Sequence, residues 1–147
     1  MKKKLTVKEI LESKGKKKLT QVYVHTTLEA NACENSGIDM IVSSENNNFK
    51  FLRESAMNTF FTVGLQYGRY LSEYEVLKRS FELFEMGADA IYCPQSARFI
   101  KAIANEGIPV VGHAGFIPYK LTHYGGFRAY GKNLNEAKKI LKEVYIL

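Results

Sequence analysis

Short apolar runs alternate with amphipathic segments along most of this chain. The runs are rich in β-branched and aromatic residues and predict strands near residues 19–25, 39–43, 59–64, 89–93 and 108–112. Apolar residues at helical spacing predict helices over residues 7–14, 27–36, 72–86, 96–106 and 134–143. Strands that alternate with helices pair in parallel through right-handed crossovers. The pattern therefore predicts an α/β fold built from βα repeats.

Local signals indicate where several of these elements begin and end. Thr6 with Glu9, and Ser72 with Glu75, have the spacing of capping boxes, in which each side chain bonds the other residue's backbone N–H. A glycine suited to the left-handed conformation after a helix leads into three of the strands, at Gly37, Gly87 and Gly107. Such tight connections are typical of repeated βα units.

The chain length limits how many units the fold contains. A closed barrel of eight βα units takes about 250 residues, whereas this chain has 147. We predict one domain over residues 1–147, a partial or truncated TIM barrel of about five to six units, with the start of a sixth strand at Val144–Leu147. An unclosed sheet leaves edges and an apolar face uncovered. We therefore expect a homo-oligomer, most simply a dimer, with contacts from Phe116, Ile117, Tyr119 and Tyr145–Leu147.

Composition excludes some other classes of protein. The net charge is +6, but six lysines lie in two runs, residues 2–4 and 16–18, without interleaved aromatics or a nucleic-acid-binding motif. We therefore interpret the runs as solvated and do not expect a nucleic-acid partner. No apolar run is long enough to span a membrane and no secretory signal is present, so we expect a cytoplasmic protein. Cys33 and Cys93 lack metal-type spacing and are expected to be free, buried thiols.

Two glycine-rich motifs carry the most chemical information. Gly-His-Ala-Gly-Phe-Ile-Pro at residues 112–118 follows an apolar run, and Gly-Gly-Phe-Arg-Ala-Tyr-Gly-Lys follows at residues 125–132. Glycines beside His113 allow a ligand to approach closely at the carboxyl end of a strand, where α/β folds place their sites. From about Thr6 to its last residue, the chain resembles the ketopantoate (3-methyl-2-oxobutanoate) hydroxymethyltransferase family, within the phosphoenolpyruvate mutase/isocitrate lyase superfamily.

The resemblance implies a TIM-barrel enzyme of pantothenate biosynthesis. Its members form or cleave a C–C bond of a small α-keto acid through an enolate that a divalent metal such as Mg²⁺ stabilises, and the one-carbon donor used here stays unidentified. Matched by position, Glu45 is the expected metal ligand, and Asn46, Tyr92 and His113 are the expected substrate-binding residues. We expect Glu45, residues 64–67, Tyr92 and His113 to converge at the carboxyl ends of the strands.

The chain also departs from the family pattern at three functional positions. Gly64 stands at the position of a metal-associated aspartate, Tyr92 at that of a lysine, and Pro94 at that of a further carboxylate. The family's proton-abstracting glutamate would match a position after residue 147. These departures predict impaired metal binding and impaired catalysis.

The residues taken by themselves leave alternatives open. Glu45 is either a solvated loop residue or a site carboxylate, and His113 either satisfies a tight turn or contacts substrate. Asp39 and Asp89, the only aspartates, fall at the starts of strands, away from a barrel's active site, and are expected to be structural. The alternatives to an enzyme are a non-catalytic small-metabolite-binding or interaction module and one part of a split enzyme.

Overall fold

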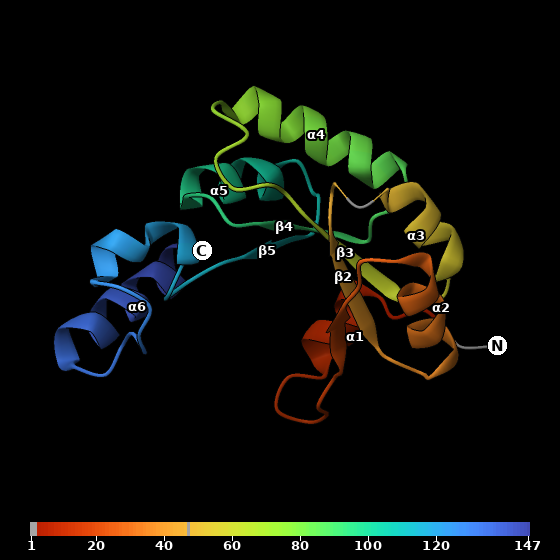
Figure 1. Cartoon of the computed structure of the whole chain (residues 1–147), viewed down its shortest axis with the longest axis horizontal. Coiled ribbons are helices and arrows are strands. Elements are labelled where there is room, and N and C mark those ends of the chain that lie inside the picture. The colour runs from red at the N-terminus through yellow and green to blue at the C-terminus, as the bar shows by residue number, and fades with distance from the viewer. Residues whose placement is uncertain (1–2, 47) are drawn as a thin grey trace.

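Five parallel strands form one open sheet in a computed structural model that describes residues 3–46 and 48–147. Lys2, part of the first basic run, lies outside this range. In sheet order the strands are β1 (Gln21–Tyr23), β2 (Met40–Ser44), β3 (Phe60–Gly64), β4 (Ala90–Cys93) and β5 (Val110–Gly112). The sheet arches without closing, so β1 and β5 form its two edges (Figure 1). The predicted partial barrel of about five to six βα units is confirmed, with five parallel strands in an unclosed sheet.

Helices cover the convex face of this sheet. They are α2 (Thr27–Asn35), α3 (Phe49–Ser55), α4 (Glu73–Glu85) and α5 (Ala97–Asn105). Figure 1 shows α4 and α5 above β4 and β5, with α2 and α3 beside β2 and β3. The helix α1 (Val7–Glu12) precedes β1, while the 3₁₀ helix η1 (Pro118–Tyr124) and α6 (Leu134–Ile146) follow β5. Both predicted capping boxes are formed, at Thr6 and at Ser72.

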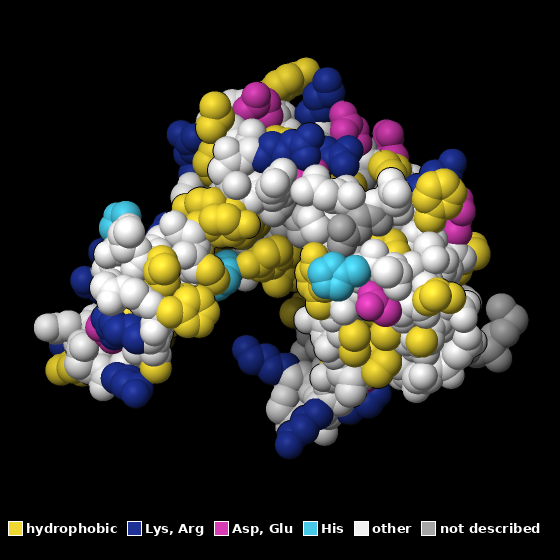
Figure 2. Space-filling model, viewed as in Figure 1, with side chains coloured by type: hydrophobic (Ala, Val, Ile, Leu, Met, Phe, Trp, Pro, Cys, Tyr) yellow, Lys and Arg dark blue, Asp and Glu magenta, His cyan; other side chains and the backbone are white. Residues whose placement is uncertain are grey.

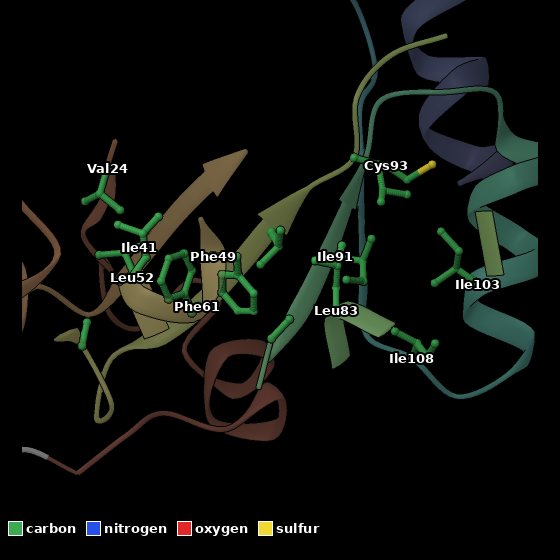
Figure 3. Packing of buried hydrophobic residues seen from close by; sticks show 14 of the residues in the cluster. Val24, Ile41, Phe49, Leu52, Phe61, Leu83, Ile91, Cys93, Ile103 and Ile108 are labelled. Atoms are coloured by element: carbon green, nitrogen blue, oxygen red, sulfur yellow. The ribbon is translucent and has the colours of Figure 1, made fainter. Parts of the chain in front are cut away.

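Strand alternation divides the side chains between two environments. On the convex side, Ile41, Phe61 and Ile91 are fully buried against the helices. They meet Phe49 and Leu52 of α3, Leu83 of α4 and Ile103 of α5 in one hydrophobic core (Figure 3). Cys33 and Cys93 are both buried, and no disulfide joins them in the described part of the chain, as expected. The strand residues that alternate with Ile41, Phe61 and Ile91 face the concave side, which the helices leave open.

Both aspartates lie at the amino-terminal edge of the sheet, where they bind backbone groups. Asp39 Oδ2 accepts the Thr20 N–H at 2.9 Å, and Asp89 Oδ2 accepts the Phe61 N–H at 2.9 Å. Asp89 also pairs with Arg53 at 3.0 Å and with Lys4 at 2.5 Å, so it ties the N-terminal segment to the sheet. The predicted structural role of these residues agrees with their contacts.

Three sequence-based expectations are wrong. Residues 144–146 continue α6 and do not begin a sixth strand, because a short apolar run has no periodicity that separates strand from helix. Helical spacing also places Phe81 and Phe84 on the inner side of α4, but both are more than 40% exposed. The buried side of α4 carries Ser80, whose hydroxyl donates to the Val76 carbonyl at 2.7 Å. The helix α3 falls in a segment expected to be a loop.

Candidate functional site

The concave side of the sheet contains a cavity of about 520 Å³ at the carboxyl ends of the strands. Figure 2 shows this side as a hollow whose upper wall carries hydrophobic side chains. Its lining comes from all five strands and from the segments that follow β3, β4 and β5: Gln21, Tyr23, Val42, Ser43, Ser44, Thr62, Gly64, Leu65, Tyr67, Tyr92, Pro94, Val111, His113, Ile117, Pro118 and Tyr119. Ligands of parallel α/β folds bind at this end of the sheet. The size lies within the range of small-molecule sites.

Tyr92 and His113 form a hydrogen-bonded pair in the wall of this cavity. The Tyr92 hydroxyl lies 2.5 Å from His113 Nδ1, and His113 Nε2 lies 3.0 Å from the Phe116 carbonyl oxygen. A carbonyl oxygen can only accept a hydrogen bond, so Nε2 carries the proton of the neutral imidazole. Nδ1 then accepts a hydrogen bond from the Tyr92 hydroxyl. Burial raises the pKa of Tyr92 above its usual value, with contributions from Cys93 and Tyr119, so the phenol stays neutral.

A stacked pair of tyrosines forms another part of the lining. The rings of Tyr67 and Tyr119 are 4.6 Å apart and nearly parallel, with 6° between their planes. Tyr67 follows β3 and Tyr119 is the second residue of η1, so the pair joins the two sides of the cavity. The sequence marked residues 64–67 as site residues but assigned Tyr119 to a dimer contact. The Pro118-Tyr119 step directly after the Gly-His motif is the signal that could have placed it here.

Glu45 shares the carboxyl end of the sheet with His113 but does not line this cavity. Ser44 faces the cavity and Glu45 follows it, so strand alternation turns Glu45 toward the helices. There its side chain is fully buried and bonded to the Arg79 Nε of α4 at 2.7 Å. The Tyr70 hydroxyl donates to the same carboxylate at 2.5 Å and the Gln66 N–H at 2.8 Å. Burial raises the pKa of Tyr70, and its bond to Glu45 adds to the shift.

Asn46 is also separate from the Tyr92–His113 cavity. Its side-chain oxygen accepts from Arg69 Nη1 at 3.2 Å, and the residue lines a second cavity with His25, Thr26, Thr27, Asn48, Phe51 and Leu52. The structure thus brings together two of the expected substrate-binding residues, Tyr92 and His113, and places the third elsewhere. The convergence expected from the sequence holds for Gly64, Leu65 and Tyr67 and for the Tyr92–His113 pair.

The described residues do not fit a magnesium ion. Mg²⁺ prefers oxygen ligands in octahedral geometry, usually with one or two carboxylates. Within residues 3–46 and 48–147, no three His, Cys, Asp or Glu side chains are grouped closely enough to hold a metal. Glu45 is the carboxylate that the sequence offers, and both its oxygens are bonded to protein groups. Metal ligation by Glu45 stays a prediction that these contacts do not favour.

A parallel βα array with a ligand-sized cavity at its strand ends defines the class of barrel-type α/β proteins. A sequence profile described as ketopantoate hydroxymethyltransferase matches residues 46–147. The chain therefore belongs to the ketopantoate hydroxymethyltransferase family, as the motifs predicted.

Curated relatives in several organisms agree with this assignment. The 3-methyl-2-oxobutanoate hydroxymethyltransferase of Kosmotoga olearia is 28% identical over 97% of this chain and 62% of its own length. The protein of the same name from Thermosipho africanus is 29% identical over 97% of this chain and 63% of its own length. That from Pyrococcus furiosus is 26% identical, with 97% and 59% covered. The chain thus spans about three fifths of the length of these relatives.

In the part of the chain that the structure describes, no helix combines the length and the apolar character needed to cross a bilayer.

Proposed function

We propose that this chain binds a small α-keto acid in the cavity on the concave side of its sheet. The observation that carries the proposal is the lining of this cavity, which is largely apolar and includes the hydroxyl groups of Ser44, Thr62 and Tyr67. Small-molecule sites combine such an apolar lining with a few placed polar groups. The name of the relatives, 3-methyl-2-oxobutanoate hydroxymethyltransferase, supports a branched keto acid as ligand.

The lining also indicates how tightly such a ligand would bind. Hydroxyl groups of Ser44, Thr62 and Tyr67 are available among the lining residues, which include no Lys, Arg, Asp or Glu. Hydrogen bonds between neutral groups and a carboxylate are weaker than those from a guanidinium. The net charge of +6 attracts anions only through a screened field. We therefore expect a dissociation constant on the order of 1 mM.

Hydroxymethyl transfer is the second candidate function, and family membership favours it. Forming an enolate at neutral pH requires an electrophile and a base. Tyr92 and His113 can hold or move a proton, but the described residues offer no cluster for a metal. In our proposal, catalysis therefore requires groups that the described residues do not supply, as in one part of a split enzyme. Binding without catalysis requires no such addition.

Calorimetric titration with 3-methyl-2-oxobutanoate tests the binding proposal. We expect saturable binding to the wild-type chain and loss of binding in Val42→Trp, because the larger side chain fills the cavity. Val144→Trp, on the exposed side of α6, is the matched control and should bind as the wild type does. Equal binding by both variants, or no binding by the wild type, would refute the proposal.

Solvent deuterium exchange separates the two candidates. Proton NMR of 3-methyl-2-oxobutanoate in D₂O follows exchange at the carbon beside the keto group, which requires an enolate. We expect no exchange above the protein-free rate, with or without Mg²⁺. An exchange rate that rises with the protein and is lower for His113→Gln would favour hydroxymethyl transfer over binding without catalysis.

A further inference from the structure

Tyr67 reaches the cavity from the tip of a tight turn. The Arg69 N–H donates to the Gln66 carbonyl at 3.3 Å, so Tyr67 and Gly68 are the two central residues of a β-turn. Gln66, Gly68 and Arg69 are exposed, and an exposed turn is mobile unless other contacts hold it. The position of Tyr67 in the cavity wall therefore depends on what holds the ends of this turn.

Glu45 binds the chain at both ends of the turn. Its Oε1 accepts the Gln66 N–H at 2.8 Å, and its Oε2 accepts the Tyr70 hydroxyl, one residue beyond the turn, at 2.5 Å. The backbone of Glu45 is fixed to the sheet, because its N–H donates to the Gly64 carbonyl at 3.0 Å. Hydrogen bonds to a carboxylate are stronger than those between neutral groups. The turn is therefore held in place from the end of the neighbouring strand.

The carboxylate itself is held in one orientation. It is fully buried, and Arg79 Nε of α4 donates to Oε2 at 2.7 Å. The resemblance implies that Glu45 ligates a metal, but ligation would require at least one of its bonds to Gln66, Tyr70 or Arg79 to break. The observed contacts direct both oxygens to the protein, and two of the three partners belong to the segment that carries Tyr67.

The turn matters to the cavity through one ring. Tyr67 lines the cavity and stacks on Tyr119, with ring centroids 4.6 Å apart. A displaced turn would remove the Tyr67 ring from the wall and leave Tyr119 without this partner. Glu45 does not line the cavity, so any effect it has on a ligand passes through the turn.

We infer that Glu45 is a positioning residue that holds Tyr67 in the cavity wall through the Gln66 N–H and the Tyr70 hydroxyl. Its effect on ligand affinity rests on the proposed function, whereas its effect on the Tyr67 ring does not. A ligand that meets a wall already in place avoids the entropic cost of ordering that wall on binding. Loss of Glu45 therefore weakens binding although the ligand loses no direct contact with it.

Two substitutions test this inference. Glu45→Met has a similar volume but lacks the two oxygens, and Arg79 keeps a second carboxylate partner. We expect the NMR cross-relaxation between the Tyr67 and Tyr119 rings to be lost in this variant. The dissociation constant for 3-methyl-2-oxobutanoate should rise about threefold to tenfold, the cost of ordering one side chain. Tyr70→Phe removes one bond and should give a smaller change in both measurements, but no further change in a Glu45→Met background.

Leu83→Ala separates positioning from stability. Leu83 is a fully buried core residue of α4, so its truncation destabilises the fold without touching the turn. This control should retain both the ring contact and the affinity of the wild type. Loss of both in Leu83→Ala would assign Glu45 a merely structural role and overturn the inference.

The remaining outcomes are also distinct. A ring contact and an affinity that stay unchanged in Glu45→Met and Tyr70→Phe overturn the inference and leave the proposed function standing. If Glu45→Met does not fold, unchanged values in Tyr70→Phe alone overturn it. If the wild type binds no keto acid, the proposed function fails, and the contact between the Tyr67 and Tyr119 rings still decides the role of Glu45.

Discussion

The ring of Tyr92 packs against Gly64 on the neighbouring strand. The two residues are register partners in β3 and β4, and a Cβ atom at residue 64 would lie 3.3 Å from Tyr92 Cδ1. The resemblance seen in the sequence implies an aspartate and a lysine at these two positions in the family. It therefore implies one spatial change, because the Tyr92 ring takes part of the space that a side chain at residue 64 would need.

This contact predicts energetic coupling between the two positions. Gly64→Ala should lower the free energy of unfolding by about 1–2 kcal/mol, since an added methyl group in a packed site forces its neighbours to move. In a Tyr92→Ala background the same substitution should cost markedly less. Urea unfolding of the four proteins gives the coupling energy. Additive effects would show that Tyr92 does not limit the space at Gly64.

The buried pair of Glu45 and Arg79 predicts a structural role for this carboxylate. Glu45→Gln should lower the free energy of unfolding by about 2–3 kcal/mol, because it removes the buried one of the two carboxylates that pair with the Arg79 guanidinium. Glu82→Gln, which removes the exposed partner of the same arginine, is the control and should cost at most about 1 kcal/mol.

The same substitution bears on metal binding. An ion that binds the folded chain raises its melting temperature. Because the described residues offer no cluster of metal ligands, Mg²⁺ up to about 1 mM should leave the melting temperature of the wild type unchanged. A rise that disappears in Glu45→Gln would reinstate this residue as a ligand.

The turn between η1 and α6 predicts a titration at low pH. Arg128 lies 2.6 Å from Glu136, and the Gly131 N–H donates to the same carboxylate at 2.8 Å. The Arg128 bond first, and then the Gly131 N–H, lower the pKa of Glu136 from 4.5 to about 2. The stabilisation is therefore complete above pH 4.5 and is lost as the pH falls toward 2.

Amide chemical shifts measure this titration directly. The Gly131 amide shift should stay constant from pH 7 to pH 5 and move only in more acidic solution, whereas in Arg128→Gln its midpoint should rise toward that of an ordinary glutamate. A wild-type midpoint at 4.5 would contradict the paired geometry.

The exposed edges of the sheet support the expectation that the chain forms a homo-oligomer. All three residues of β1 are exposed, and Tyr145 of α6 is 81% exposed. We expect light scattering at micromolar concentration to give a dimer, and Tyr145→Glu to weaken it while Leu28→Glu on α2 does not. Ile117 is buried, so it is no longer a candidate contact. A monomer at all concentrations would contradict the expectation.

The sequence predicted the sheet because its signals are local. Each strand is a short apolar run, and the helices at Thr6 and Ser72 begin with capping boxes that form as expected. The helix α3 escaped prediction because its seven residues are too few to show periodicity. Its N-cap, Asn48, is in the left-handed conformation and makes no side-chain capping bond. No local sequence pattern predicts such a helix.

The site was predicted in position but not in contacts. The Gly-His motif located His113, yet its partner Tyr92 lies 21 residues earlier, and only the sheet register brings the two together. Continuing the strand alternation beyond Ser44 could have predicted that the Glu45 side chain points away from the cavity. Its bond to Arg79 depends on how α4 crosses the sheet, which no spacing of residues reveals.

The most direct test of the central claim is a nitrogen-15 NMR titration with 3-methyl-2-oxobutanoate in the presence and absence of EDTA. The claim is that the concave cavity binds a keto acid through its own residues, without a metal. We predict saturable shifts at Gly64, Leu65, Tyr92 and His113, which line the cavity, and the same shifts with EDTA. Shifts that vanish with EDTA, or that map to the second cavity around Asn46, would contradict the account.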